Sequence, residues 1–397
     1  MTVSKKDAGN HRMTFSSPST HFLDLVSTRF EVDRRLIRNF SSLQDLRKRA
    51  PTAAREASVS EYLDFADQLV ACIEHVFDWK FANTLLKLAD SGKLRSKTTQ
   101  YQKLANSLIQ SRDLESVART DEPLFDYQSK GLSAEVPFTL LVADHPVSYA
   151  YLWALQKYSL APEEIIFFVS GRHQKRRFAR LSLLTYERWI RNLGSSFSRD
   201  VRLSLGAKFT LRDFLGSKSL RPIHTGSVND PTMQHKLANA SSSNILFSSG
   251  GREEIISPET FSITRKNFLH FHPGVLPEIR GADGLLWSAL LRQQAGVSGF
   301  WMRRGIDSGP VVAVSEFAFP DFGRRLRSVP TDVFYHNLLN TYDPLLRAKA
   351  MLDLFSNQWS LNQALEKSGD SGGTGSSRQY HPMHRTLRNK VISVIRG

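Results

Sequence analysis

Two rhythms of apolar and polar positions divide this chain near residue 136. Before that point apolar residues recur every three or four positions, most clearly from Ser60 to Leu88, and this spacing predicts an amphipathic helix. Ser58 and Glu61 have the spacing of a capping box at its start. Further helices are predicted over 22–48 and 98–110. We therefore expect residues 20–135 to form a helical extension.

After residue 136, short apolar runs alternate with helical patterns. The predicted strands are 138–144, 164–170, 222–228, 244–249, 267–272, 297–302 and 311–317. The predicted helices between them are 147–160, 173–193, 231–240 and 283–293. Alternation of this kind predicts an α/β domain with a doubly wound, mostly parallel sheet, which we assign to residues 136–318.

Polar and flexible segments mark the remaining boundaries. Residues 1–19 are rich in Ser, Thr and Lys and predict a disordered leader. Residues 319–367 predict a helical appendage, with helices over 343–355 and 361–367. A Gly/Ser linker over 368–378 and a basic tail over 379–397 follow.

The composition limits the class of protein. With 397 residues and 41% apolar residues, the chain can hold two or more folded domains. Cys72 is the single cysteine, which excludes an intramolecular disulfide and a cysteine-based zinc cluster and fits a reducing compartment. The chain has no run of 18 apolar residues and no signal-peptide core. We therefore expect a cytoplasmic protein that has no membrane partner.

The net charge of +15 is concentrated in one segment. Residues 171–221 hold 13 Lys and Arg against three acidic residues. Such a segment suits an anionic partner such as tRNA, a nucleotide-sugar pyrophosphate or a phosphorylated carrier. A solvated face of a basic protein is the alternative interpretation.

The candidate chemistry lies in the stretch 267–312. His270 and His272 project from the same face of a predicted strand because strand side chains alternate. Pro273 and Gly274 end that strand, and Asp307 lies in a later loop between two more strands. Two histidines and a carboxylate at strand ends predict a catalytic site.

The order of these residues resembles the folate-dependent formyltransferase family, which includes glycinamide ribonucleotide, methionyl-tRNA and nucleotide-sugar formyltransferases. The matching motifs are His272-Pro273-Gly274, Leu276-Pro277, Arg280-Gly281 and Asp307-Ser308-Gly309, with Ser257-Pro258-Glu259 upstream. The resemblance covers residues 138–312 and is strongest toward their end. It implies a formyltransferase-like variant of the Rossmann fold.

The resemblance also implies roles for three residues. His272 would stabilise and protonate the developing oxyanion, and Asp307 would hold its useful tautomer and favour its charged form. His270 stands where the family has a catalytic Asn, and it would take over that residue's contact with the formyl oxygen. A histidine donates such a hydrogen bond only in the correct tautomer or when charged.

The formyl donor implied by the resemblance is 10-formyltetrahydrofolate. Its pteridine ring would lie against two loops, and the residues expected to bind it are Gly251, Arg252, Glu253, Ile255, Ile256, Arg304, Gly305 and Ile306. Arg252 would pair with a glutamate tail of the folate or face solvent.

The predicted activity is transfer of a formyl group to a primary amine of a small, anionic acceptor. An amino sugar or a specialised-metabolite amine is the first expectation, ahead of methionyl-tRNA. The loop ADHPVSYA after the first strand lacks a glycine-rich phosphate cradle, which argues against purine synthesis. The appendages would shape the acceptor site or a homodimer contact.

Two other classes of function stay open at this stage. A metal-dependent hydrolase would use His270, His272 and Asp307 as a facial metal site. A catalytically inactive formyltransferase-like module would bind nucleic acid or protein through the basic segment.

Overall fold

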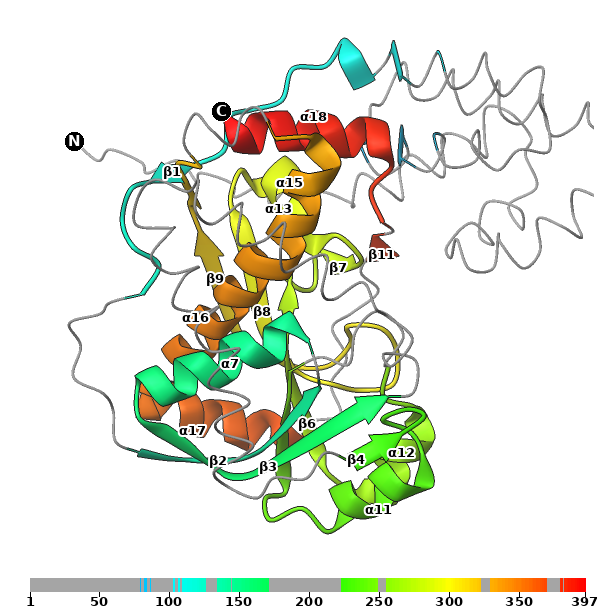
Figure 1. Ribbon diagram of the computed structural model, residues 1–397, viewed down its shortest axis with the longest axis vertical. Helices are drawn as coiled ribbons and strands as arrows, with labels where there is room; N and C mark the ends of the chain where they lie inside the picture. The colour runs from blue at the N-terminus through cyan, green and yellow to red at the C-terminus, as the bar shows by residue number, and fades with distance from the viewer. Residues whose placement is uncertain are drawn as a thin grey trace, which may run out of the picture. The chain divides into compact units, whose positions relative to one another are not determined.

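The computed structural model describes residues 109–125, 134–143, 145–170, 223–248, 255–322, 329–369, 379–380 and 382–397, with isolated positions between 79 and 107 (Figure 1). The chain divides into two compact units, 1–111 and 112–397, and the fold described below is that of the second. The predicted leader, the helix 22–48 and the basic segment 171–221 lie outside the described residues. The described positions within the predicted helix 60–88 are helical.

A seven-stranded sheet with the order β4-β3-β2-β5-β6-β8-β9 forms the centre of this unit. Its strands are β2 (Ala134–Ala143), β3 (Leu160–Ser170), β4 (Ile223–Thr225), β5 (Asn244–Phe247), β6 (Asn267–Pro273), β8 (Ala295–Trp301) and β9 (Val311–Phe317). The pairings from β4 to β6 are parallel, whereas β8 runs antiparallel to both of its neighbours. The predicted α/β class with a mostly parallel sheet is confirmed.

The helices begin where the sequence supplies caps. They are α7 (Pro146–Lys157), α11 (Pro231–Ala238), α12 (Pro258–Thr264), α13 (Gly284–Arg292), α15 (Thr331–Asn337), α16 (Asp343–Ser356), α17 (Gln358–Glu366) and α18 (Arg385–Arg396). The side chains of His145, Ser257 and Asn357 each accept a hydrogen bond from a first-turn backbone amide, at α7, α12 and α17 respectively. Proline occupies the first turn of α7, α11, α12 and α16.

Helices α7 and α16 lie side by side against the sheet, and α16 also packs on β6, β8 and β9 (Figure 1). Phe138 of β2 stacks between Trp301 of β8 and Phe355 of α16. The Trp301 indole donates a hydrogen bond to the Ala364 carbonyl of α17 at 2.7 Å. The helices of residues 343–366 therefore cover the sheet directly.

A second cluster packs α11 and α12 against the sheet. It includes Met233 and Leu237 of α11, Phe168 of β3 and Phe268 of β6, all of which are fully buried. Phe271 of the same strand instead meets the ring of Tyr151 in α7. The alternation along β6 thus supplies both layers of the core.

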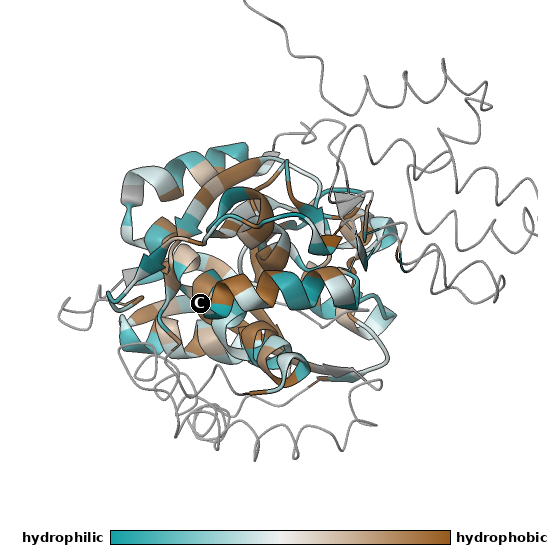
Figure 2. Ribbon diagram, turned by 90° about the horizontal axis from the view of Figure 1, so that it is seen from above, coloured by the Kyte–Doolittle hydropathy of each residue, from teal (hydrophilic) through white to brown (hydrophobic). Residues whose placement is uncertain are grey.

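The C-terminal segment returns to the domain. Helix α18 packs on α13 and α15 through an apolar stripe whose residues are Leu387, Val391, Ile392 and Ile395 (Figure 2). Strand β11 (Gln379–Tyr380) pairs with β7 (Arg280–Gly281), and β1 (Arg119–Thr120) pairs with β10 (Phe319–Pro320). Residues Gln379 and Tyr380 therefore lie beside the Arg280-Gly281 motif.

Two short helical turns complete the unit. A π-helical turn η1 (Leu338–Tyr342) joins α15 to α16, and a 3-10 turn η2 (Lys367–Gly369) follows α17. Among the described residues, no helix is both long and apolar enough to cross a membrane.

Candidate active site

Strand β6 carries both histidines to the end of the sheet. Its parallel ladder with β5 ends at the pair Leu246 and Leu269, so His270 follows immediately after the last pairing. On the other side β6 continues beside β8, where His272 faces Ser298. His270 and His272 therefore sit where the carboxyl end of β6 leaves its parallel neighbour, which is the usual place for a site in such sheets.

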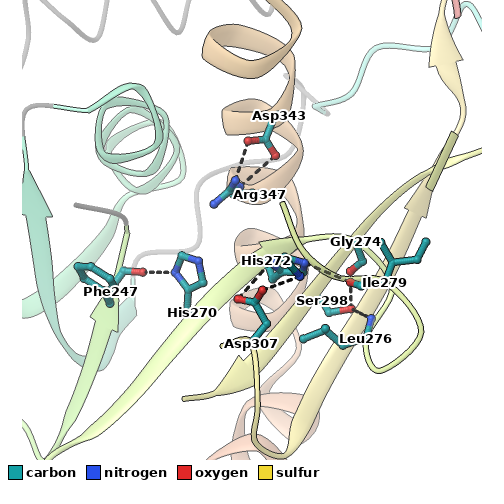
Figure 3. Close-up of polar contacts among 11 residues, drawn as sticks. Phe247, His270, His272, Gly274, Leu276, Ile279, Ser298, Asp307, Asp343 and Arg347 are labelled. Carbon is teal, nitrogen blue, oxygen red and sulfur yellow. Dashed lines mark hydrogen bonds and ion pairs between the residues drawn. The ribbon is translucent and has the colours of Figure 1, made fainter. Parts of the chain in front are cut away.

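The imidazole of His272 is held between two acceptors (Figure 3). Its Nδ1 atom lies 3.4 Å from Oδ1 of Asp307, and its Nε2 atom lies 3.2 Å from the carbonyl oxygen of Ile279. The residue is only 3% exposed. Burial lowers the pKa of His272, and the Asp307 carboxylate acts in the opposite direction. A hydrogen on either ring nitrogen of His272 therefore has an acceptor: Asp307 at Nδ1 and the Ile279 carbonyl at Nε2.

Asp307 is fixed from its other oxygen. The backbone amide of Gly281 donates a hydrogen bond to Oδ2 at 2.8 Å, which leaves Oδ1 for His272. Asp307 has a left-handed backbone with φ of +46°, and the turn is closed by the amide of Arg303 bonding to the Ser308 carbonyl. The Asp307 motif and the Arg280-Gly281 motif are therefore joined by a hydrogen bond.

The loop after β6 requires glycine beside His272. Gly274 has φ of +148°, and a Cβ atom there would stand 2.7 Å from the Ile279 carbonyl oxygen. Buried Ser298 ties the loop to β8 by accepting from the amide of Leu276 at 2.9 Å and donating to the Gly274 carbonyl at 2.8 Å. These contacts hold the acceptor that faces Nε2 of His272.

His270 has a different orientation. Its Nδ1 atom lies 2.8 Å from the carbonyl oxygen of Phe247, and because a carbonyl can only accept, Nδ1 carries the proton. Burial first, and then the charge of Arg347, lower the pKa of His270 to about 4. The neutral ring thus presents an unprotonated Nε2, which has no partner among the described residues. This tautomer does not fit the oxygen-donor role that the resemblance implies.

Arg347 is the residue that sequence reasoning missed. It comes from the first turns of α16 and pairs with Asp343 through Nε at 3.0 Å and Nη2 at 2.7 Å. Its charge acts on both histidines and on Asp307 (Figure 3). The spacing of Asp343 and Arg347 predicts only a helical ion pair, so nothing in the sequence signals this position.

The expected donor-binding residues separate into groups. Gly251, Arg252 and Glu253 lie outside the described residues. Ile255 is 54% exposed, whereas Ile256 is 3% exposed and belongs to the apolar cluster beneath α11 and α12. In the second loop Arg304 and Gly305 are exposed and Ile306 is partly buried. Met302, just before this loop, packs on the same cluster as Ile256, so the cluster underlies both expected donor loops.

The described residues do not provide the ligand set that the metal-site alternative needs. Within the part of the chain that the structure describes, no group of three His, Cys, Asp or Glu side chains is arranged to hold a metal ion. Nδ1 of His270 faces the Phe247 carbonyl, and both nitrogens of His272 face other acceptors. Both nitrogens of His272 are therefore already engaged, and only Nε2 of His270 has no partner among the described residues.

Comparison with known proteins gave matches only among solved structures. No family model and no curated protein matches the chain. A sugar N-formyltransferase from a Shewanella species matches with 12% identity and a TM-score of 0.34, over 65% of this chain and 87% of that one. Phosphoribosylglycinamide formyltransferases from Streptococcus pneumoniae and Campylobacter jejuni match with 15% and 16% identity and TM-scores of 0.33 and 0.32. They cover 55% and 56% of this chain, and 99% and 98% of their own.

Proposed function

We propose that this chain transfers a formyl group from 10-formyltetrahydrofolate to the primary amine of a small acceptor. The observation that carries the proposal is the contact of His272 with Asp307 at the carboxyl end of β6. The motif order around these residues, together with the amide of Gly281 on Asp307, supports the same chemistry. A single buried histidine would be weak support; the joined motifs are much more specific.

Formyl transfer makes two demands on the protein. Negative charge builds on the formyl oxygen as the amine attacks, so a donor must be aimed at that oxygen. The amine must also lose a proton, so an acceptor must lie nearby. When bound, 10-formyltetrahydrofolate supplies an amide-like formyl group. The residues of this site divide the two demands between them.

His272 is suited to the first demand. In the structure its Nε2 atom lies 3.2 Å from the Ile279 carbonyl oxygen, and in the proposed reaction the formyl oxygen takes the place of that carbonyl as acceptor. The Asp307 carboxylate favours the charged ring, which can donate from Nε2 to the oxyanion while Nδ1 donates to Asp307. His272 is therefore the proposed donor and Asp307 its positioning residue.

His270 is suited to the second demand. The Phe247 carbonyl holds the proton on Nδ1 and leaves the lone pair of Nε2 toward the site. The rings of Phe247 and Phe300 pack beside the imidazole and restrict its rotation. We assign His270 the role of accepting the amine proton and passing it to the folate nitrogen that leaves as the formyl bond breaks, in place of the donor role of the family's Asn.

The described donor-loop residues fit a pteridine ring in part. Ile255 offers an exposed apolar side chain, and Gly305, with φ of +109°, lets the backbone approach a flat ring closely. Ile256 is committed to the core, so we propose Ile255, Gly305 and Ile306 as the contacts among the described residues.

The acceptor is proposed to be an amino sugar or a specialised-metabolite amine, ahead of methionyl-tRNA. A glycinamide ribonucleotide would need a phosphate cradle at the start of α7. There the His145 side chain accepts from the amide of Val147, and Pro146 has no amide hydrogen to offer. The first two amide positions of α7 are therefore not available to a phosphate group.

The test is an amine-dependent transfer assay with isotopically labelled 10-formyltetrahydrofolate. Amino sugars, amino-acid-derived amines and methionyl-tRNA would be supplied in parallel, with and without EDTA. We expect labelled formamide product with one acceptor class, insensitive to EDTA and lost in Asp307→Asn but not in Asp353→Asn, a matched change on the exposed part of α16. Calorimetry with 5-formyltetrahydrofolate provides an independent check. No binding of that analogue and no transfer to any amine would overturn the proposal.

A further inference from the structure

Helix α16 brings one guanidinium to the site from outside the region that resembles the formyltransferase family. Arg347 lies beyond Val312, where the resemblance ends, and its side chain is 12% exposed. Figure 3 shows it between Asp343 and the two histidines. A charge so placed requires an explanation.

The ion pair uses only part of the guanidinium. Asp343 engages Nε and Nη2 in the two-pronged geometry that fixes the plane of the group. Nη1 has no hydrogen-bond partner among the described residues. Burial acts to lower the pKa of Arg347, but Asp343 outweighs it and the pKa lies above its ordinary value. Nη1 is therefore a permanently charged, pre-oriented donor.

The acidic group of the site does not use this donor. Both oxygens of Asp307 are already engaged, one by Gly281 and one by His272, although the charges of Asp307 and Arg347 influence each other. His270 directs the lone pair of a neutral ring nitrogen to the site and so does not neutralise the charge of Arg347. The site therefore has an oriented cation beside a proton acceptor.

A second donor lies next to the pair. Tyr151 of α7 is fully buried, and within the described part of the chain its hydroxyl has no hydrogen-bond partner. Burial raises the pKa of Tyr151, and the charges of Arg347 and Asp343 also act on it, so the hydroxyl keeps its proton. Buried polar groups without partners are uncommon and often mark a place where a ligand or water completes the hydrogen bonds.

The backbone before the pair is also unusual. The π-helical turn η1 ends at Tyr342, directly before Asp343. A π turn shifts the phase of the helix that follows, and such turns occur frequently at functional sites. Here the phase shift determines the direction in which the side chains of Asp343 and Arg347 leave the axis of α16.

Stability alone is a poor explanation of the pair. Removing two charges from water costs free energy that their attraction only partly returns. Lys349 and Asp353 form an ion pair of the same spacing on the same helix, with side chains 27% and 45% exposed. The Lys349–Asp353 pair is an ion pair of the same spacing that lies away from the site, and it provides a matched control for substitutions of Arg347 and Asp343.

We propose that Arg347, through Nη1, binds an anionic group of the acceptor, a carboxylate or a phosphate, and thereby holds the acceptor amine beside Nε2 of His270. This assignment rests on the proposed formyl transfer and names the chemical class of its substrate. It makes Arg347 a specificity-determining residue.

The experiment compares three small primary amines of similar length: ethanolamine, β-alanine and O-phosphoethanolamine. Their binding to the full chain is measured by calorimetry without a formyl donor, and their KM is measured separately in the transfer assay. We expect β-alanine or O-phosphoethanolamine to bind roughly 10- to 100-fold more tightly than ethanolamine, the range expected for charge-assisted hydrogen bonds. The stronger of the two shows whether the anion is a carboxylate or a phosphate.

Three variants make the comparison specific. Arg347→Gln combined with Asp343→Asn removes both charges without leaving one buried alone, and it should abolish the preference for the anionic amine. Arg347→Lys keeps the charge without the fork and should retain only part of the preference. Lys349→Met should retain all of it. Circular dichroism and thermal unfolding show that each variant is folded.

The outcomes separate this inference from the proposed function. Equal binding of all three amines, or a preference that survives in a folded double variant, overturns the role of Arg347. Arg347-dependent binding of an anionic amine with no transfer supports the anion site and counts against formyl transfer. Transfer that is indifferent to the acceptor's charge supports formyl transfer and overturns the anion site.

Discussion

The Nδ1 atom of His270 lies 2.8 Å from the carbonyl oxygen of Phe247, which is 23 positions earlier in the chain. The parallel ladder of β5 and β6 ends one residue before this pair, and at this position the imidazole of His270 contacts the Phe247 carbonyl. This contact decides the tautomer of His270. In the proposed mechanism this tautomer makes His270 a proton acceptor rather than a hydrogen-bond donor.

Replacing His270 by Asn separates these two roles. The Asn amide can still donate to Phe247, but it cannot take up a proton, so we expect kcat to fall about 10²-fold with little change in KM. Steady-state kinetics at saturating donor provide the measurement. An unchanged or higher kcat would show that His270 acts as the family's Asn does.

Replacing Asp307 by Asn tests the positioning of His272. The side chain can still accept from the Gly281 amide, but it no longer carries the charge that favours a protonated His272. We expect kcat to fall by about 10²-fold or more while the melting temperature changes little. The control is Asp353→Asn, and full activity in Asp307→Asn would remove the pair from the mechanism.

The buried histidines make stability depend on pH in a defined window. The pKa of His270 is about 4 in the folded chain and near 6.5 when unfolded, so the unfolded chain binds the proton at a higher pH. Stability is therefore intact above about pH 6.5 and falls as the pH drops toward 4. The lowered pKa of His272 acts in the same direction. Urea unfolding at pH 7.5 and 5 should show a smaller loss for His270→Gln than for the wild type, and equal losses would contradict this account.

Replacing Ser298 by Ala should loosen the loop that faces His272. The hydroxyl is fully buried and bonds both the Leu276 amide and the Gly274 carbonyl, so its loss leaves two buried groups unpaired. We expect a cost of about 2 kcal/mol in the free energy of unfolding. Ser356→Ala, whose exposed hydroxyl bonds one carbonyl, should cost less than about 0.5 kcal/mol. Denaturant titration of both variants checks the difference, and equal costs would refute the bridging role.

Gly284 is required by the close approach of α13 to β6. An added Cβ atom would stand 1.4 Å from the carbonyl oxygen of Pro273, so Gly284→Ala must displace backbone at the end of β6. We expect Gly284→Ala to lower the free energy of unfolding by about 2–4 kcal/mol. Gly226→Ala is the control, because its Cβ atom would meet side-chain atoms of Asp230, the nearest at 2.9 Å, and no backbone atom lies as close. Thermal unfolding that fails to rank the two variants in this order would disprove the steric argument.

The sequence by itself determined the class of fold and the seven strands of the central sheet, but it did not predict helices α15 and α18. Strands such as β6 and helices such as α16 follow from apolar spacing, because neighbours within a few residues decide which face can be buried. The same local order placed His270 and His272 on one strand end, and the motif resemblance pointed to Asp307. Short-range patterns are enough for such features.

Only the tertiary structure decided the hydrogen-bond partners, burial and charge environment of the site residues. The sequence does not show that Phe247 sets the tautomer of His270, that Ile256 is core while Ile255 is exposed, or that Arg347 reaches the histidines. Each of these depends on groups that are distant in the chain and close in space. The pKa of a side chain depends on its burial, on nearby charges and on its hydrogen bonds. The spacing of residues along the chain does not specify these surroundings.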